Sequence, residues 1–326
     1  GIRDELPPDV LRWIDVGVPI VAAHVPSGLD PDTGTTTGRT FRADITVAFH
    51  ALSPGHLLGS GPDLCGRVTV ADIGLEGGEP TLEVVTDADA ALPARPRTAH
   101  KWSAGSVLVV GGSRGMVGAA VMAAKSALRF GAGAVGLAVP GEMSQIAASL
   151  APEILSYDQT DLPDRFDVIV AGPGMGDAPD VLKRVLAHDG PVVLDADALA
   201  EDLPAMLDQR SVPTVLTPHA GELERLTGGG SDWHAARELA TSTGTVVLLK
   251  GSPTIVCGRG SPRVVTTNGP ELASIGTGDV LAGMIGAAIA RGMEPAAATA
   301  AAAHWHGVAA SDLAAERTVT ADALVE

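Results

Sequence analysis

The sequence predicts an α/β protein built on a mainly parallel β-sheet that is covered by helices. From His100 onward, short apolar runs alternate with Ala-rich runs of helical length, which is typical of a doubly wound or related sheet. Hydrophobic residues make up 45% of the 326 residues and aromatic residues only 3%. The core therefore consists of Ala, Val, Leu and Ile, a composition that favours a helix-covered parallel sheet over an aromatic-rich sandwich.

The first 75 residues contain three strand candidates and little helix. The candidates are Val18–Val25, Ala43–Phe49 and Arg67–Ile73. Three such strands cannot close an α/β domain alone, so we interpret residues 1–76 as the end of a domain that lacks an upstream piece or leans on the rest of the chain. Residues 77–98 are rich in Gly, Pro and acidic side chains and are predicted to be a linker.

Residues 99–326 have the alternating pattern throughout. The expected strands are Ser106–Val110, Ala134–Val139, Val168–Ala171, Val192–Leu194, Val215–Leu216 and Val246–Leu249, and the expected helices are Ala119–Phe130, Val280–Ile289 and Pro295–Ala315. Five of these strands run into polar loops rich in Gly, Pro or Asp. Because ligands bind outside the carboxyl ends of strands in open α/β sheets, we expect these loops to converge on one site.

Charge and cysteine usage exclude several classes of function. The formal net charge of -17 argues against binding nucleic acid through its phosphates. Cys65 and Cys257 have no metal-ligand spacing and form no disulfide framework, so both are expected to be small buried hydrophobes. The absence of a membrane-spanning run and of a signal peptide predicts a cytoplasmic protein with no membrane partner.

The run Gly276-Thr277-Gly278-Asp279 precedes a strongly apolar stretch and predicts the start of a buried helix. Its glycines allow backbone N–H groups to approach a charged ligand, and a helix N-terminus attracts anions, so Gly276, Thr277 and Gly278 form a candidate anion hole. Asp279 lies in the first turn. There it acts either as a partner of the helix dipole or as a proton acceptor, and its local sequence leaves both interpretations open.

Other loops carry further candidate groups, each with a structural alternative. Lys250-Gly251-Ser252-Pro253-Thr254 offers a cation and two hydroxyl groups for nucleotide phosphates or ribose, or is a simple turn. Asp195 and Asp197 could hold Mg²⁺ through water, or Asp197 could cap a helix. His219 could cap the helix that carries Glu222. His304 and His306 point to different faces of a helix and are interpreted as structural.

Two common nucleotide-binding motifs are absent. The loop Gly112–Gly118 follows a strand and precedes a helix, but its spacing is not G-x-G-x-x-G and no ribose-binding acid follows the next strand, which disfavours a dehydrogenase. The Walker A pattern G-x-x-x-x-G-K-[ST] is also missing, which excludes a P-loop enzyme. The glycines of the loop still permit close approach of a phosphate-bearing ligand.

Seven blocks of residues 100–326 resemble the ADP/ATP-dependent NAD(P)H-hydrate dehydratase family. They are His100-Lys101, Gly111–Ala119, Gly172–Gly176, Asp195–Leu199, Thr217–Glu222, Lys250–Thr254 and Gly276–Gly283. The resemblance implies a ribokinase-like three-layer sandwich for residues 99–326. Residues 18–75 resemble the C-terminal part of the NAD(P)H-hydrate epimerase domain, a partial Rossmann-like α/β segment. The matching residues there are Val25-Pro26-Ser27-Gly28-Leu29-Asp30, Pro54-Gly55-His56 and Cys65-Gly66.

The resemblance implies a hydro-lyase of metabolite repair that returns (6S)-NADHX and (6S)-NADPHX to NADH and NADPH, with Mg²⁺ and with ADP or ATP as co-substrate. The C6 hydroxyl would be phosphorylated and phosphate then eliminated. The nucleotide would be bound by Lys250, Gly251, Ser252, Pro253, Thr254 and Gly278. The hydrated dinucleotide would be contacted by Ala119, Gly174, His219 and Asp279, with Asp279 as the catalytic base.

Departures from the epimerase pattern concern its substrate site. His24 stands where the pattern has Asp, and Ser53 stands where it has Lys, so we predict no epimerase activity. Ser27, a potassium-ligand position in that family, is retained. In the dehydratase region, Ser274-Ile275 precedes Gly276 where relatives place another Gly or small residue, so a slight shift of that loop is expected.

Two other functions fit the same features. One is a ribokinase-like kinase of a vitamin alcohol, which would release its phosphorylated product. The other is a nucleotide-binding regulator without catalytic activity. The Ala-rich helices and the acidic surface are compatible with a homo-oligomer, which we expect.

Overall fold

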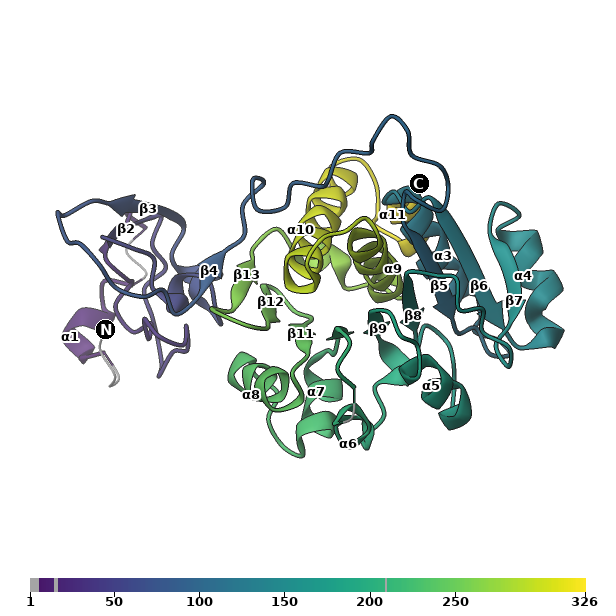
Figure 1. Ribbon diagram of the computed structural model, residues 1–326. Coiled ribbons are helices and arrows are strands. Elements are labelled where there is room, and N and C mark those ends of the chain that lie inside the picture. Colours follow the sequence, from purple (N-terminus) through teal and green to yellow (C-terminus); the bar gives the residue numbers. More distant parts are fainter. Residues whose placement is uncertain (1–5, 15–16, 209) are drawn as a thin grey trace. The chain divides into compact units, whose positions relative to one another are not determined.

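A computed structural model describes residues 6–14, 17–208 and 210–326. The chain forms two compact units, Gly1–Leu82 and Glu83–Glu326 (Figure 1). Residues 1–5, 15 and 16 of the predicted segment 1–76 lie outside the described residues. Among the described residues, no helix reaches the length and apolarity needed to cross a bilayer.

The first unit contains a three-stranded parallel sheet with the order β1-β2-β3. The strands are β1 (Val21–Ala23), β2 (Ile45–Phe49) and β3 (Arg67–Ala71), and the short helices are α1 (Pro8–Leu11), η1 (Pro54–His56) and α2 (Gly61–Leu64). All three predicted strands are present but shorter than predicted. One face of the sheet is buried through Ala22, Thr46 and Ala48, whereas Val21 and Phe49 on the other face are exposed.

The second unit is organised around a ten-stranded sheet with the order β4-β13-β12-β11-β10-β9-β8-β5-β6-β7. Every neighbouring pair is parallel except β11–β12 and β12–β13. The strands are β4 (Glu83–Val84), β5 (Ser106–Val110), β6 (Ala134–Val139), β7 (Leu155–Asp158), β8 (Val168–Ala171), β9 (Val192–Leu194), β10 (Thr214–Leu216), β11 (Val246–Leu249), β12 (Thr254–Cys257) and β13 (Arg263–Val265). The predicted α/β class with a mainly parallel sheet is confirmed.

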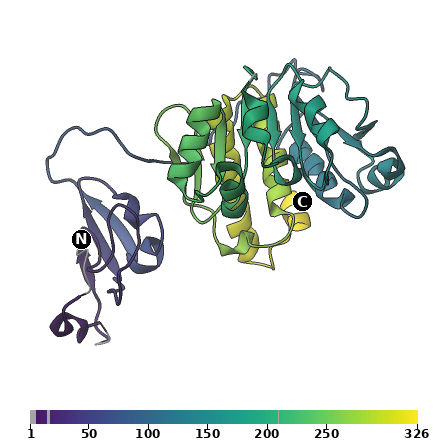
Figure 2. The same ribbon diagram turned by 90° about the horizontal axis from the view of Figure 1, so that it is seen from below.

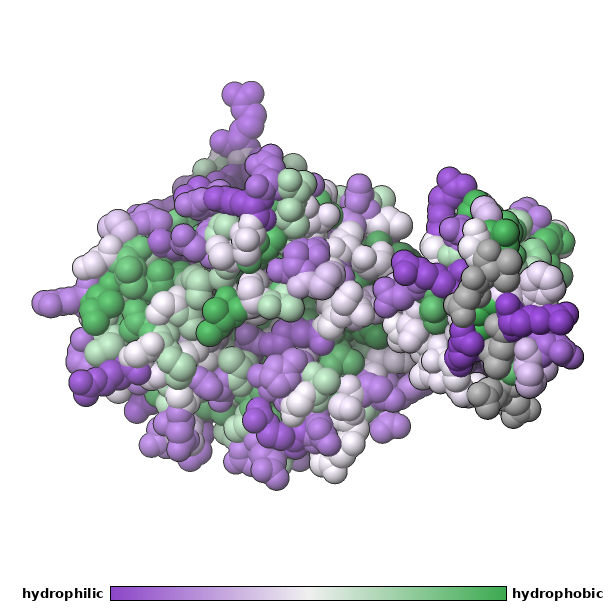
Figure 3. Space-filling model, turned by 180° about the vertical axis from the view of Figure 1, so that it is seen from behind, coloured by the Kyte–Doolittle hydropathy of each residue, from purple (hydrophilic) through white to green (hydrophobic). Residues whose placement is uncertain are grey.

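Helices cover both faces of this sheet and complete three layers (Figures 1 and 2). The layer on one face contains α3 (Val117–Arg129), α9 (Thr277–Ala290), α10 (Pro295–Ala314) and α11 (Ala321–Val325). The opposite layer contains α5 (Pro179–Leu186), α6 (Leu203–Leu207), α7 (Ala220–Thr227) and α8 (Trp233–Thr243). The helix α4 (Ser144–Leu150) packs on β6 and β7 at one end of the sheet. Apolar side chains gather on the surface there, where Ile146, Leu150 and Leu155 are exposed (Figure 3).

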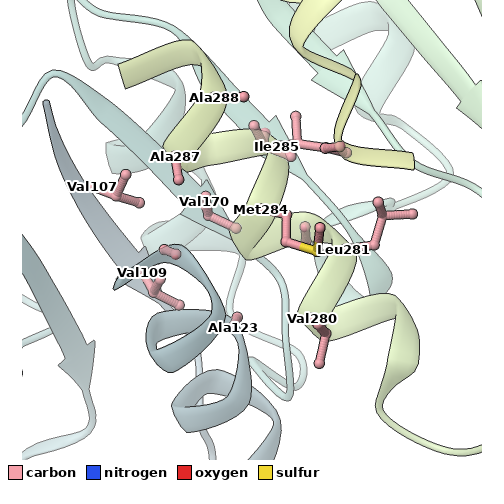
Figure 4. Packing of buried hydrophobic residues seen from close by; sticks show 14 of the residues in the cluster. Val107, Val109, Ala123, Val170, Val280, Leu281, Met284, Ile285, Ala287 and Ala288 are labelled. Atoms are coloured by element: carbon pink, nitrogen blue, oxygen red, sulfur yellow. The ribbon is translucent and has the colours of Figure 1, made fainter. Parts of the chain in front are cut away.

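The helix α9 lies at the centre of the core and packs against both α3 and the strands beneath it (Figure 4). Its residues from Val280 to Ile289 are all buried, as the apolar sequence predicts. A Cβ atom at Gly283 would collide with the backbone carbonyl oxygen of Ala123, so glycine is required where α3 and α9 approach each other. This close packing fixes the position of the N-terminus of α9, where the candidate anion hole begins.

The structure places residues 83–98 of the predicted linker in the second unit. The strand β4 pairs with β13, and Val85 and Ala90 are buried. The Trp305 Nε1–H group on α10 donates to the Ala90 carbonyl oxygen at 2.8 Å. Burial of these apolar side chains explains why the segment packs on the sheet and on α10 although its composition is typical of a linker.

Candidate active site

A cavity of about 550 Å³ lies at the carboxyl ends of β10 and β11 and beside the N-terminus of α9. Its lining residues come from five separate stretches of the chain: His219; Lys250, Gly251, Ser252 and Thr254; Asn268, Gly269, Pro270, Leu272, Ala273 and Ser274; Thr277, Gly278 and Leu281; and His306. The loops after β10 and β11 are held together because the Lys250 N–H group donates to the Pro218 carbonyl oxygen at 2.8 Å. Of the five polar loops expected to converge, the loops after β10 and β11 line this cavity, and the loop after β9 reaches it through the contact of Asp195 with Lys250.

Lys250 is the cationic centre of the cavity wall. Its Nζ atom lies 2.7 Å from Asp195 Oδ1 and 3.5 Å from Glu222 Oε2. The Thr217 hydroxyl group donates to the same Asp195 oxygen at 2.7 Å. Burial acts to lower the pKa of Lys250, but the two carboxylates outweigh it, so the pKa is raised and the side chain is charged.

Hydroxyl groups fix the rest of the Lys250 loop. The Ser252 Oγ–H group donates to the Asn268 carbonyl oxygen at 2.8 Å, and the Thr254 Oγ1–H group donates to the Gly251 carbonyl oxygen at 2.8 Å. The first of these bonds joins the loop after β11 to the segment after β13. The loop is thus an ordered part of the cavity wall.

Helix α9 begins at Thr277, three residues before the predicted start at Val280. Gly276 is the N-cap with φ of 88°, a left-handed conformation that favours glycine. The Thr277 hydroxyl group donates to the carbonyl oxygens of Leu272 and Ser274 at 2.8 and 3.0 Å. Thr277 and Gly278 line the cavity. Backbone N–H groups in the first turn of a helix have no partner within that helix, so these two residues bring such N–H groups to the cavity wall.

Asp279 follows in the first turn of α9; it does not line the 550 Å³ cavity, and its carboxyl group interacts electrostatically with Lys250 and with the aspartates after β9. Burial raises its pKa to about 7, Asp195 adds to this rise, and Lys250 opposes it. A carboxylate that served only as a partner of the helix dipole would have a lowered pKa. A pKa near neutrality is the property expected of a general base.

The other residues predicted to contact substrate lie around a neighbouring pair of loops. A Cβ atom at Gly174 would lie 3.2 Å from the Ala119 Cβ atom, so these two residues are adjacent. The Gly112 N–H group donates to the Pro173 carbonyl oxygen at 3.0 Å, which holds the two Gly-rich loops together. Neither Ala119 nor Gly174 lines the 550 Å³ cavity. A separate hollow of about 340 Å³ begins beside Gly176 and Asp197.

His219 caps α7, as the structural alternative predicts, and it also borders the cavity. Its Nδ1 atom accepts from the Glu222 N–H group at 3.1 Å, and Glu222 Oε2 accepts from the His219 N–H group at 2.8 Å, which makes a capping box for α7. Its side chain is 59% exposed, and the residue lines the cavity beside Lys250. The ring therefore caps a helix and can still be reached by a ligand.

The aspartates after β9 have one occupied carboxylate oxygen each. Asp195 Oδ1 binds Lys250, and Asp197 Oδ2 accepts from the Gly176 N–H group at 2.8 Å. Among the described residues, no group of three or more His, Cys, Asp or Glu side chains could hold a metal ion. Within the part of the chain that the structure describes, the other oxygen of each carboxylate has no hydrogen-bond partner, which suits Mg²⁺ that keeps its waters and is shared with ligand phosphates, because such ions use few protein ligands.

Two buried polar side chains of the cavity wall were not predicted as site residues. Asn268 follows β13 and lacks any motif, and His306 was interpreted as structural. Asn268 Oδ1 and both ring nitrogens of His306 are buried and have no hydrogen-bond partner within the described part of the chain. Only the three-dimensional packing shows that they border the cavity, so the sequence carries no signal for them.

The first unit contains Ser27, His24 and Ser53. Ser27 is exposed after β1. His24 Nδ1 accepts from the Phe49 N–H group at 3.2 Å, and its Nε2 atom lies 3.2 Å from Ser53 Oγ. The His56 Nε2–H group donates to the His24 carbonyl oxygen at 2.6 Å. The two residues that depart from the epimerase pattern thus contact each other. Cys65 of this unit and Cys257 of the second are buried free thiols, as expected.

Comparison with known proteins identifies two family models along the chain. The model described as NAD(P)H-hydrate dehydratase matches residues 107–326, and the model of the YjeF-related protein N-terminus matches residues 1–55. The chain is 39% identical to the bifunctional NAD(P)H-hydrate repair enzyme Nnr of Salinibacter ruber, over 92% of this chain and 63% of that protein. It is 35% identical to the corresponding enzyme of Escherichia coli, over 91% of this chain and 61% of that protein. The chain thus spans about three fifths of these relatives.

Solved structures resemble the second unit. The ADP/ATP-dependent NAD(P)H-hydrate dehydratase of Bacillus subtilis, co-crystallised with ATP and Mg²⁺, is 30% identical with a TM-score of 0.68, over 75% of this chain and 95% of that chain. A ribokinase-like superfamily protein of Enterococcus faecalis is 25% identical with a TM-score of 0.69, over 77% of this chain and 95% of that chain.

Proposed function

This chain belongs to the NAD(P)H-hydrate dehydratase family, and from that premise we propose that it converts (6S)-NADHX and (6S)-NADPHX to NADH and NADPH with ADP or ATP as co-substrate. One observation carries the proposal: a cation and an acid of raised pKa meet at the N-terminus of α9. A Cβ atom at Gly278 would lie 3.6 Å from Lys250 Nζ, and Asp279 is the next residue. This pairing suits proton removal beside a phosphate.

Asp279 takes the proton of the C6 hydroxyl group in the proposed reaction. The C6 oxygen then forms a bond to the terminal phosphorus of the nucleotide, and the bond between that phosphorus and the leaving AMP or ADP breaks. Phosphate next leaves C6 with the C–O electron pair, assisted by the ring nitrogen, and loss of a C5 proton restores the dihydropyridine. Phosphorylation is needed because water is a poor leaving group, whereas phosphate is a good one.

Lys250 and the first turn of α9 supply positive charge where phosphate charge accumulates. Such transfer depends on positioning and electrostatic stabilisation. Mg²⁺ bound with the nucleotide would neutralise further phosphate charge, and Asp195 and Asp197 would hold it through their free oxygens. Gly251, Ser252, Pro253, Thr254 and Gly278 are proposed to complete the nucleotide site.

The hydrated dinucleotide is proposed to lie against Ala119, Gly174 and His219. The adjacency of Ala119 and Gly174 supports this placement only in that one ligand could contact both residues, since a Cβ atom at Gly174 would lie 3.2 Å from the Ala119 Cβ atom. The exposed ring of His219 offers a hydrogen-bonding group between this area and Lys250.

We further propose that residues 1–76 are the C-terminal part of an epimerase domain without epimerase activity. Both ring nitrogens of His24 contact groups of its own unit. Burial, and after it the neighbouring His56, lower the pKa of His24, so its ring is neutral and cannot replace a carboxylate. Ser27 would then be a retained potassium-ligand position in a domain that catalyses no reaction.

The test supplies purified protein with hydrated NADH, ADP and Mg²⁺ and follows the return of dihydropyridine absorbance. We expect Asp279→Asn to lower turnover by about 10² to 10⁴-fold while nucleotide binding remains, because general-base catalysis contributes about that much. Asp180→Asn, which changes an exposed acid on α5, is the control and should keep full activity. The (6R) epimer should not be consumed faster than it epimerises spontaneously.

Full activity of Asp279→Asn would disprove the assignment of the base. A kinase of a vitamin alcohol would instead consume ATP with an alcohol and restore no absorbance, and a regulator would bind nucleotide with no turnover of either kind.

A further inference from the structure

Ile275 is an isoleucine that lies in solvent beside the candidate active site. The residue is 97% exposed, whereas the other exposed large hydrophobic residues in the described part of the chain are between 36% and 64% exposed. It lies between Ser274, which lines the 550 Å³ cavity, and Gly276, the N-cap of α9. Asp279 follows in the first turn of that helix. Ile275 is also a position at which this chain departs from the dehydratase pattern, which has Gly or another small residue there.

The backbone on both sides of Ile275 is held in place. The Thr277 Oγ1–H group donates to the Ser274 carbonyl oxygen at 3.0 Å, a hydrogen bond that spans Ile275. A Cβ atom at Gly276 would lie 2.7 Å from Met122 Cε, so this glycine packs closely on α3. The outward position of Ile275 therefore belongs to an ordered loop.

Met116 provides a second exposed apolar side chain, at the start of the neighbouring helix α3. It is the N-cap of α3 and is 45% exposed. A Cβ atom at Gly174 would lie 2.9 Å from Met116 Cβ and 3.2 Å from Ala119 Cβ, so Met116 adjoins two residues proposed to contact the hydrated dinucleotide. Ala119 and Met122 are three residues apart and are neighbours on the surface of α3. One face of α3 thus connects the Gly174 loop with the loop that carries Ile275.

Hydration changes the nicotinamide ring in a way that an apolar side chain can recognise. In the hydrate, C4 and C5 are both methylene carbons, and C6 carries the hydroxyl group. Burial of a methylene group against an apolar side chain is favourable, whereas a hydroxyl group needs a polar partner. Asp279 and the exposed Ile275, close together at the start of one helix, match the polar and the apolar part of this ring.

We propose that Ile275 and Met116 pack against the C4 and C5 methylene groups of the hydrated ring and so position the C6 hydroxyl group for Asp279. The inference rests on the proposed function and adds residues that bind the ring rather than the nucleotide or the phosphates. Ile275 takes no part in the transfer of the proton or of the phosphoryl group. Its contact is the same before and during the reaction, so its loss should appear in KM and not in kcat.

The experiment measures binding of hydrated NADH and of ADP, each alone, by calorimetry on the full chain. Ile275→Ser should bind hydrated NADH about tenfold more weakly than the unmodified protein, the lower end of what full burial of an isoleucine provides. Its KM for the hydrate should rise by about the same factor, while kcat and the affinity for ADP stay within about twofold. Ile275→Val keeps a branched apolar side chain and should bind the hydrate within about threefold of the unmodified protein, and Met116→Ala should weaken binding about threefold.

Ile146→Ser is the matched control. It removes an isoleucine that is 49% exposed on α4 and should leave the affinity for hydrated NADH, the affinity for ADP and the KM unchanged. Because Ile275 and Ile146 are both exposed, both serine variants should unfold at the same urea concentration as the unmodified protein.

An unchanged affinity of Ile275→Ser for hydrated NADH would overturn the proposal. An equal loss of ADP affinity would also overturn it, because the change would then act through the first turn of α9. Dissociation of an oligomer in Ile275→Ser, measured by light scattering, would assign the side chain to a contact between copies of the chain and would overturn the proposal as well. Weaker binding of hydrated NADH by Ile275→Ser, with no dehydration by the unmodified protein, would refute the proposed function alone. Dehydration with the same KM in both proteins would refute this inference alone.

Discussion

Asp279 should make the protein less stable at high pH, and Asp279→Asn should remove that loss. The folded state raises the pKa of this carboxyl group from 3.8 to about 7. Below about pH 4 the group is protonated in both the folded and the unfolded chain, so wild type and variant should have similar stability. Between about pH 4 and pH 7 the unfolded chain releases the proton and the folded chain retains it, so the free energy of unfolding of the wild type falls relative to the variant.

The size of this effect follows from the pKa difference. At about 1.4 kcal/mol for each pH unit, the rise to about 7 corresponds to about 4 kcal/mol above pH 7. Asp279 is partly exposed, and solvent reduces the effect, so we expect about 2 to 4 kcal/mol. A domain has a net stability of about 5 to 15 kcal/mol, so a difference of this size is readily measured.

Urea unfolding of the full chain at pH 4, 6 and 8, followed by fluorescence, measures the difference. The variant should be more stable than the wild type at pH 8 and equal to it at pH 4. Asp180→Asn on the surface of α5 should show no such pH dependence. Equal stability of Asp279→Asn and wild type at pH 8 would mean that the carboxylate is not desolvated, and the argument for a base with a pKa near neutrality would fail.

Two further changes probe the same region. Lys250→Met removes the cation that lowers the pKa of Asp279. The rising limb of the plot of kcat/KM against pH should therefore move to higher pH, and nucleotide affinity should fall. A rising limb at the same pH as in the wild type would contradict this coupling. Gly283→Ala inserts a methyl group against the Ala123 carbonyl and should lower the free energy of unfolding, measured with urea, by about 1 to 3 kcal/mol or more. The control Gly118→Ala changes an open position in the first turn of α3 and should leave the free energy of unfolding unchanged or raise it. Equal effects of the two changes would refute the close packing of α3 and α9.

Much of the fold could be predicted because the central strands of the parallel sheet are largely apolar and buried. The strands β5, β6, β8, β9 and β11 match their predicted bounds, since each is a short apolar run that ends in a polar loop. The strands β12 and β13 were not predicted. They follow the Lys250 loop closely and pair in an antiparallel way, so they lack the intervening helix on which the alternating pattern depends.

The parts of the candidate site that consist of residues adjacent in the sequence could be predicted. The parts that form only when distant segments pack together could not. Lys250 and the Gly276–Gly278 run stand out in the sequence because of their composition. Asn268 and His306 do not, because their significance is the absence of a partner, which depends on how the segment after β13 and α10 pack around the cavity. The same holds for Glu222, whose contact with Lys250 follows from the capping box of α7.

For Asp279, the local sequence predicts a pKa shift in the opposite direction from the one that the complete structure gives. An acid in the first turn of a helix is stabilised as an anion by the dipole, which lowers its pKa. Here the nearest cation, Lys250, is already shared by Asp195 and Glu222, so three carboxylates surround one positive charge. The excess of negative charge and the burial of Asp279 outweigh the helix terminus. The same excess means that a nucleotide, with its own negative phosphates, enters this site most favourably with a cation bound to it.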